Sequence, residues 1–386
     1  MNNVSSSNSQ KVHVPELRFH EFREDLQQSK LSDISVYKTK RATDVKSHYI
    51  STENLLQNCM GIVPYTDETA IDGISFSIND ILLGNIRPYL KKAWLAEFDG
   101  VCSTDVLVLH PLKIEPLYFK YLICRDKFFT YVMSSAKGSK MPRGDKAFIM
   151  DMTISLPSIN EQKKLASMLM LIDTLISKQE KLVDEIKLYK RGVENLYFSK
   201  KYNNHCRLKD ILIERNENSV KNNEHDVISS TKNGLFKQCD YFNKQASSED
   251  TTGYKIIRLE QIVFSPQNLW MGNINYNDSY DIGIVSPSYK IFDINDGFDK
   301  YYIACLLKSS QAIKEYILAS EQGASIVRRN LNMELFLQVA FFMPDLEEQI
   351  KISKHLKLLS NQLDNQEHTL KALLTMKQGL LQKMFI

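Results

Sequence analysis

The sequence predicts an α/β protein in which two globular α/β domains form a tandem repeat and are joined by two long helices packed as an antiparallel coiled coil. Three observations predict this architecture. The hexapeptides PSINEQ (157–162) and PDLEEQ (344–349) each precede a long run of leucine, isoleucine and charged residues. Both runs keep a seven-residue apolar repeat. The segments before them are rich in β-branched and aromatic residues and are broken by Gly, Asn and Pro, as in α/β domains.

The composition is that of a folded globular chain. A length of 386 residues corresponds to about two to three domains, and 43% hydrophobic with 25% charged residues is ordinary for such domains. The net charge of +3 is too small to indicate a nucleic-acid partner by itself. The cysteines lack metal-binding spacing, and no apolar run approaches the ~18 residues of a membrane span. We therefore expect a cytoplasmic protein without a membrane segment or a bound metal.

The repeat gives the expected domain boundaries. An offset of 187 residues places Pro157 on Pro344, Gln162 on Gln349 and Phe198 on Phe385. The resulting segments are a polar tail (1–14), a first globular domain (15–156), a first long helix (157–202), a second globular domain (203–343) and a second long helix (344–386).

The globular segments contain matching candidate strands and helices. The candidate strands are DILLGNI (80–86), VCSTDVLVLH (101–110), EQIVFSP (260–266) and GIVSPSYKIF (283–292). Short helices are expected at LYFKYLIC (117–124) and FDKYYIAC (298–305). Each half of the chain is then one globular domain followed by one long helix.

Both long helices are expected to begin with a capping box. Ser158 with Glu161, and Asp345 with Glu348, have the spacing in which the first side chain accepts a hydrogen bond from an early helix N–H. In this motif the glutamate reaches back to the N-cap backbone. The preceding prolines suit the extended residue just outside a helix start.

The apolar stripe after each cap is narrow enough to be a coiled-coil seam, and the natural partner of each helix is the other. A glutamine at the same heptad of both helices either fixes the register, if the two amides meet, or lies at the edge of the seam. At ~1.5 Å per residue, a helix from Asn160 to Phe198 would be roughly 58 Å long and could act as a spacer. The residues predicted to pack the helix pair are Leu165, Leu169, Ile172, Ile176, Gln179, Ile186, Ile352, Leu356, Leu359, Leu363, Gln366 and Leu373.

These features resemble a known family. The segment PELRFHEF (15–22), KLSDI (30–34), the two P-x-x-x-E-Q helix starts and the two helix ends KRGVENLYF (190–198) and KQGLLQKMF (377–385) resemble the specificity subunit of type I restriction-modification systems. The resemblance covers nearly the whole chain, and the helix motifs carry most of it.

The resemblance implies a function. Each globular domain would be a target-recognition domain for one half of a split, asymmetric DNA site, and the helices would set the gap between the halves. The subunit would have no catalytic residues of its own and would bind double-stranded DNA, two modification subunits and restriction subunits. Adenine methylation, with the base flipped from the duplex, would occur on the partner. S-adenosylmethionine, ATP and Mg would therefore be expected on partner subunits, with no cofactor in this chain.

Basic loops are the candidate DNA contacts, because Lys and Arg neutralise phosphate while Arg and Asn can read base edges. Any one of these residues could instead belong to a solvated loop without a role in binding. Trp94, behind the first loop, could equally be a core residue. The candidates are Arg87, Tyr89, Lys91, Lys92, Lys137, Lys140, Arg143 and Lys146 in the first domain, and Asn268, Trp270, Asn273, Arg328, Arg329 and Asn330 in the second.

Other chemistries lack their motifs. SPSY (286–289) is the nearest match to the tetrapeptide with which adenine methyltransferases hold a flipped base, but it has Ser in place of the acceptor Asn or Asp. No phosphate-binding G-x(4)-G-K-[ST] loop occurs. The histidines His48, His110 and His355 have no nucleophile or carboxylate at motif distance. The alternative of a different class is a non-enzymatic coiled-coil adaptor whose globular domains bind proteins.

Overall fold

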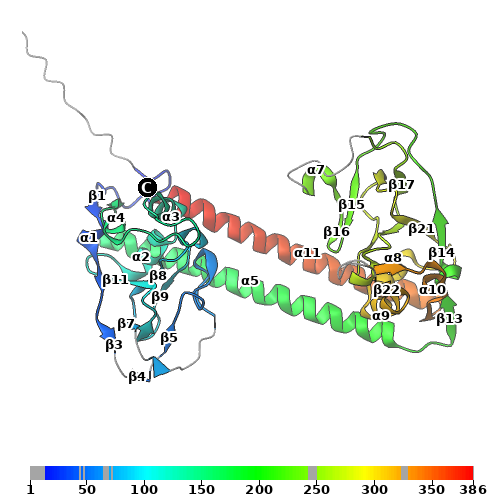
Figure 1. Ribbon diagram of the computed structural model, residues 1–386, viewed down its shortest axis with the longest axis horizontal. Helices are drawn as coiled ribbons and strands as arrows, with labels where there is room; N and C mark the ends of the chain where they lie inside the picture. The colour runs from blue at the N-terminus through cyan, green and yellow to red at the C-terminus, as the bar shows by residue number, and fades with distance from the viewer. Residues whose placement is uncertain are drawn as a thin grey trace, which may run out of the picture. The chain divides into compact units, whose positions relative to one another are not determined.

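The chain divides into two compact units in the computed structural model, which describes residues 14–42, 45–46, 48–63, 69–70, 73–241, 250–322 and 329–385. The first unit contains Met1–Glu180 and Thr369–Ile386, and the second contains Lys181–His368. Each unit therefore holds one globular domain together with a part of each long helix (Figure 1).

The first unit is built on an antiparallel sheet with the strand order β2-β11-β8-β9. Smaller sheets pair β1 with β12, β4 with β6, and β3-β7-β10-β5 in that order. The elements are β1 (Gln27–Lys30), α1 (Leu31–Ile34), β2 (Ser35–Lys38), β3 (Arg41–Ala42), β4 (Val45–Lys46), β5 (Tyr49–Ile50), η1 (Gln57–Cys59), β6 (Thr69–Ala70), β7 (Gly73–Phe76), β8 (Ile81–Gly84), η2 (Pro88–Leu90), β9 (Ala93–Leu95), β10 (Gly100–Cys102), β11 (Val106–Pro111), α2 (Pro116–Ile123), α3 (Asp126–Ser134), α4 (Lys146–Met150) and β12 (Thr153–Leu156).

The second unit repeats this plan with the sheet β14-β21-β18-β19 and the pairs β13–β24, β17–β20, β15–β16 and β22–β23. Its elements are β13 (Asn204–Arg207), α6 (Leu208–Ile211), β14 (Leu212–Arg215), β15 (Ile228–Thr231), β16 (Gly234–Lys237), α7 (Gln238–Tyr241), β17 (Lys255–Arg258), β18 (Ile262–Phe264), η3 (Leu269–Met271), β19 (Ile274–Tyr276), β20 (Ile282–Val285), β21 (Lys290–Ile294), α8 (Lys300–Lys308), α9 (Ser310–Leu318), β22 (Ser320–Gln322), β23 (Arg329–Leu331), α10 (Met333–Gln338) and β24 (Ala340–Met343). The predicted repeat thus extends through the globular domains, where the sequences have diverged.

The main sheet of the first unit is buried on both faces. Successive side chains of a strand point to opposite sides, and those of β8 enter two different core clusters. Ile81 and Leu83 of β8 belong to a core shared with α2, α3 and the long helices. Leu82 belongs to a second cluster that contains Trp94. Trp94 is 5% exposed, so it is a core residue of the first unit.

Two of the predicted strands are each two strands in different sheets. The segment 101–110 contains the end of β10 and most of β11, and the segment 283–292 contains most of β20 and the first part of β21. Tight turns divide them: Val106 N–H donates to Ser103 O at 2.9 Å, and Tyr289 N–H donates to Ser286 O at 3.0 Å. The predicted single strands were wrong because the serines form turns, which reverse the chain between sheets.

The long helices are α5 (Ile159–Ser199) and α11 (Leu346–Lys383), and they pack antiparallel within each unit. In the first unit Lys377 Nζ lies 2.7 Å from Asp173 Oδ1. In the second unit the Tyr197 hydroxyl lies 2.8 Å from His355 Nδ1. The early part of one helix therefore lies beside the late part of the other, as an antiparallel coiled coil requires.

The predicted seam residues differ in burial along the helices. Gln179 and Gln366 are half-buried and belong to different units, so pairing of their amides stays a prediction. Leu363 and Leu373 are also half-buried. The fully buried members are Leu165, Leu169, Ile172, Ile176, Ile186, Ile352, Leu356 and Leu359.

The repeated glutamine at each helix start has a structural role that the capping-box interpretation missed. Gln162 donates to Pro157 O at 2.9 Å and accepts from Glu115 N–H, the N-cap of α2, at 3.0 Å. Gln349 makes the same two bonds, to Pro344 O at 2.9 Å and from Asp299 N–H at 3.0 Å. The P-x-x-x-E-Q motif therefore joins each long helix to the preceding short helix.

The predicted capping boxes are confirmed at Asp345 and differ from the prediction at Glu161. Asp345 does cap α11, because it accepts from Glu348 N–H at 2.8 Å. Glu161 is 2% exposed, and its carboxylate bonds a segment before the helix. Its two carboxylate oxygens accept from Arg18 at 2.8 and 2.7 Å, so a buried ion pair fixes the segment before β1 to the start of α5.

Candidate nucleic-acid interface

A strained turn after β8 carries the first group of predicted DNA contacts. Arg87 and Lys91 have φ values of 53° and 51°, in the left-handed region, on either side of the 3₁₀ turn Pro88–Leu90. This backbone costs a non-glycine residue about 1 to 2 kcal/mol and is often found at functional sites. The turn leaves Arg87 exposed and Tyr89 51% exposed.

The second predicted basic loop, 137–146, packs directly on this turn. Arg87 N–H donates to Pro142 O at 2.8 Å, and Lys137 and Arg143 exchange two backbone hydrogen bonds of 3.0 Å. Gly144 N–H donates to the side chain of Asn85 at 3.1 Å. A Cβ atom on Gly144 would lie 2.6 Å from Val132, so only glycine allows this approach. The structure therefore brings together two basic segments that lie about fifty residues apart in the sequence.

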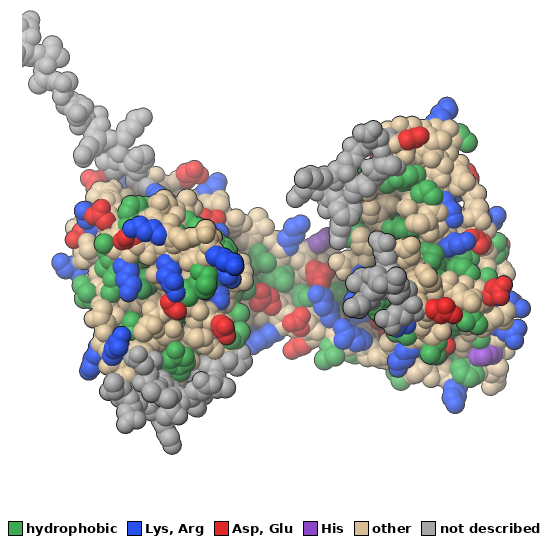
Figure 2. Space-filling model, in the orientation of Figure 1, with side chains coloured by type: hydrophobic (Ala, Val, Ile, Leu, Met, Phe, Trp, Pro, Cys, Tyr) green, Lys and Arg blue, Asp and Glu red, His purple; other side chains and the backbone are tan. Residues whose placement is uncertain are grey.

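The cations of this surface are not equally available. Arg143 lies 3.0 Å from Asp105, and Lys137 lies 3.7 Å from Asp145. Hydrogen bonds from Phe148 and Ala147 N–H hold the pKa of the Asp145 carboxyl below its usual value. Among the described residues, no carboxylate pairs with the exposed cations Arg87, Lys140 and Lys146. Figure 2 shows Lys and Arg side chains gathered on the visible face of this unit.

Lys91 and Lys92 are already committed within the first unit. Lys91 Nζ lies 2.6 Å from Asp126, and Lys92 Nζ donates to Thr52 O at 2.6 Å. Both side chains are half-buried. They hold the turn after β8 in place, and a DNA contact by either would require it to exchange its present partner.

The second unit places Trp270 and Arg329 together. The Arg329 guanidinium carbon lies 5.2 Å from the centre of the Trp270 ring, and Arg329 N–H donates to Gln267 O at 3.3 Å. Such a cation over an indole face is attracted by the ring. Asn268 is half-buried at the start of η3, while Asn330 is exposed. Arg328 lies outside the described residues.

Asn273 is not groove-facing as predicted. It is 8% exposed, and its amide donates to Ser230 O at 3.1 Å and accepts from the Ser230 hydroxyl at 2.8 Å. Asn275 continues this network by donating to Thr231 O at 2.8 Å. The prediction was wrong because a polar side chain two residues into a loop can turn inward when another strand offers it hydrogen bonds.

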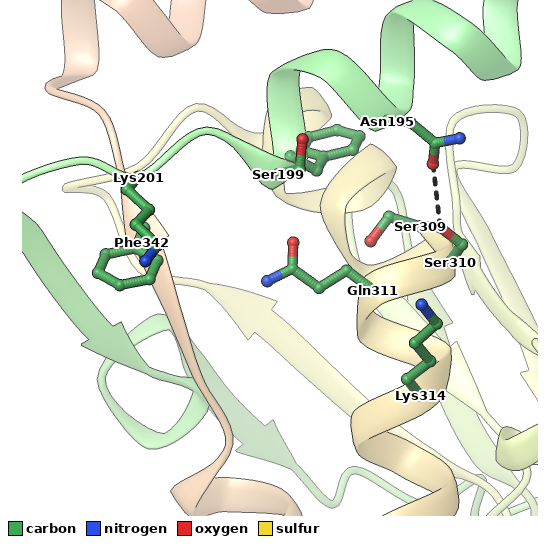
Figure 3. Close-up of a pocket in the computed structure, with 9 residues that line it drawn as sticks. Asn195, Ser199, Lys201, Ser309, Ser310, Gln311, Lys314 and Phe342 are labelled. Carbon is green, nitrogen blue, oxygen red and sulfur yellow. Dashed lines mark hydrogen bonds between the residues drawn. The ribbon is translucent and has the colours of Figure 1, made fainter.

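A pocket of about 430 Å³ in the second unit lies apart from this surface (Figure 3). It opens between the end of α5 and the start of α9, where Asn195 Oδ1 accepts from the Ser310 hydroxyl at 3.0 Å. Lys201 and Lys314 line it. Arg329 instead donates to Ile317 O, near the other end of α9.

His110 has a carboxylate neighbour that the sequence did not reveal. Its Nδ1 lies 2.7 Å from Asp80, which is fully buried and also accepts from Lys38 at 2.6 Å and from Ser77 N–H at 2.7 Å. In the second unit the corresponding turn uses a glutamine: Arg258 N–H donates to Gln261 at 2.7 Å. Because an uncharged side chain takes the same place, the Asp80 cluster reads as a structural turn rather than a catalytic site.

A family model, described as the type I restriction modification DNA specificity domain, matches residues 24–188. This segment therefore resembles a DNA specificity domain of that family. A curated relative, the type I restriction enzyme MjaVIII specificity subunit of Methanocaldococcus jannaschii, is 29% identical over 153 residues, which are 39% of this chain and 35% of the relative. The matched region thus spans about a third of that relative's length.

Solved structures extend the likeness in fold over both units. The S subunit of a type I restriction-modification system from M. genitalium aligns with a TM-score of 0.59 and 15% identity, over 97% of this chain and 99% of that one. A chain from a study of complex assembly and conformational transition of the type I R-M system gives 0.59 and 15%, over 95% and 98%. The chain therefore shares its fold with these two structures over nearly its whole length. Within the described residues, no helix is long and apolar enough to cross a membrane.

Proposed function

We propose that the chain is the DNA-specificity subunit of a type I restriction-modification complex. The observation that carries the proposal is the repetition of the specificity-domain fold: the first unit matches the family, and the second repeats its strand order with a different loop surface. Two related but different domains suit a bipartite, asymmetric DNA site.

The proposal divides the surface into phosphate and base contacts. Arg87, Lys140 and Lys146 are exposed cations of the first unit and suit contacts to the DNA backbone. Arg143 is held by its ion pair with Asp105 and Arg329 by the Trp270 ring, so they suit a fixed position at a base edge or phosphate. Pre-positioned side chains lose less freedom on binding.

The chemistry would belong to partner subunits. Two modification subunits would methylate adenine with S-adenosylmethionine, and restriction subunits would use ATP and Mg. The complex would act on DNA in the cytoplasm, with this chain supplying recognition alone. We further propose that α5 and α11 set the gap between the half-sites. Removing four residues after Asn160 should then change the preferred gap, and an unchanged gap would refute this role.

The test is to co-express the chain with its modification subunit and to map methylated adenines by single-molecule sequencing. A split, asymmetric motif with a fixed gap supports the proposal. Duplex binding that weakens steeply with salt would support it independently. A chain that binds no duplex at any salt concentration and assembles with no modification subunit would instead be a protein-binding coiled-coil adaptor.

A further inference from the structure

The second unit contains a two-stranded hairpin with an exposed turn. Strands β15 and β16 are antiparallel, with Thr231 opposite Gly234, and Figure 1 shows them side by side with α7 at the end of β16. Lys232 and Asn233 form the turn. The Thr231 hydroxyl closes it by donating to Gly234 O and accepting from Asn233 N–H, both at 3.1 Å. The turn therefore has a defined backbone.

Buried asparagines fix this hairpin to the main sheet. Asn275 is 2% exposed and donates to both the Ser230 hydroxyl and Thr231 O at 2.8 Å. Asn273 donates to Ser230 O, which lies on β15 next to Thr231. The amide hydrogen bonds of Asn273 and Asn275 are directional, so they set where the hairpin lies as well as holding it. The turn is consequently positioned by the core of the unit, two residues from its last anchor.

The same network joins the turn to the candidate interface. Asn273 N–H donates to Asn268 O at 3.4 Å, which places the hairpin beside η3. Arg329 also contacts the η3 turn, through Gln267 O and the Trp270 ring. Three segments from distant parts of the sequence thus meet around η3, and each contributes a polar or cationic side chain.

The two turn side chains, Lys232 and Asn233, are exposed. No described residue pairs with the Lys232 ammonium or hydrogen-bonds the Asn233 amide. The asparagines that anchor the hairpin have bonds to it, whereas the Asn233 amide has neither a donor nor an acceptor partner in the described part of the chain. An amide with a free donor and acceptor on a fixed turn is suited to reading a base edge.

We propose that the β15–β16 turn is a DNA-reading element of the second unit, in which Asn233 contacts a base edge and Lys232 a backbone phosphate beside Arg329. The inference rests on the proposed function. A two-stranded ribbon fits the major groove, which is about 12 Å wide, and an asparagine amide pairs two-fold with adenine. The phosphate contact sets the register of the turn on the duplex.

The experiment uses the full chain in complex with its modification subunit. Methylation motifs are mapped for the wild type, for Asn233→Ala and for Lys232→Ala. Matched controls are Asn203→Ala and Lys209→Ala, which remove exposed side chains of the same types elsewhere in the second unit. Thermal melting of each complex shows whether folding is retained.

Asn233→Ala should relax one base position of one half-site by about tenfold or more while the other half-site stays unchanged. Lys232→Ala should weaken binding to all sites and lower the salt slope by about one. A wild-type motif retained by Asn233→Ala would overturn the inference and leave the proposed function standing. A wild-type complex without any motif would overturn both.

If Asn233→Ala abolished methylation, the inference would be tested by competitive binding of duplexes that differ only in the half-site read by the second unit. A folded variant that no longer discriminates between them supports the inference. A variant that discriminates as well as the wild type overturns it. Asn233→Asp, which keeps the shape of the side chain but removes its donor, should behave as Asn233→Ala does.

Discussion

Replacing Gln162 by Ala should destabilise the first unit through two specific hydrogen bonds. Gln162 is 3% exposed, and its amide serves Glu115 N–H and Pro157 O. In the variant the buried Pro157 O and the half-buried Glu115 N–H would both lose this partner. Each such group costs about 1 to 3 kcal/mol, so we expect a loss of about 2 to 6 kcal/mol for the pair.

The two tryptophans make the measurement local, because Trp94 lies in the first unit and Trp270 in the second. In a Trp270→Phe background, urea unfolding followed by Trp94 fluorescence reports the first unit. Gln162→Ala should lower that midpoint. Gln349→Ala removes the equivalent bonds and should lower the midpoint of Trp270 fluorescence in a Trp94→Phe background.

The matched control is Gln378→Ala, an exposed glutamine on the part of α11 that belongs to the first unit. Surface substitutions of this kind usually change stability by about 0.5 kcal/mol or less. A Gln162→Ala midpoint equal to that of the control would refute the reasoning, since the two hydrogen bonds would then contribute nothing measurable.

Three further outcomes are expected. Arg143→Ala should weaken binding to one half-site only, as measured by competition between duplexes, and equal weakening of both halves would contradict the assignment of one unit to each. Leu169→Asp, at a position with 0% exposure, should cost several kcal/mol by burying a charge, whereas Leu171→Asp, at 60% exposure, should change little. Circular dichroism and unfolding midpoints compare the two. Burial raises the pKa of Glu194 above its usual 4.5, despite the opposing effect of Lys190, so the folded state binds this proton more tightly. Stability should therefore fall as the pH rises above about 4.5 through the folded pKa, and Glu194→Gln should remove this loss. If the free energy of unfolding changed with pH equally in the variant and the wild type between pH 5 and 7.5, the prediction would be wrong.

Local patterns were sufficient to predict the helices and the repeat. The heptad spacing of Leu165, Leu169, Ile172 and Ile176 depends only on residues that are near in sequence, and all four are buried. The strands were less certain because a serine turn and a continuing strand look alike in a short apolar run. The segment 101–110 was therefore predicted as one strand, although it contains parts of β10 and β11.

The candidate interface needed the tertiary structure. Charge and glycine content located the two basic loops of the first domain, but their meeting at Pro142 depends on how distant strands pack. Asn273 and Asn233 also show that local sequence does not predict whether a loop asparagine is buried or exposed. Both are asparagines in loop-like sequence, yet one is turned inward by Ser230 and the other is exposed.

The sequence by itself determined two repeated halves, the antiparallel helix pair and the family resemblance, because periodicity, capping residues and repeated motifs are local signals. Only the tertiary structure decided which polar side chains face solvent and which anchor the fold. Burial and hydrogen-bond partners are set by residues far away in the chain, so Gln162, Glu161 and Asn275 acquire their roles only when Glu115, Arg18 and Thr231 are brought beside them.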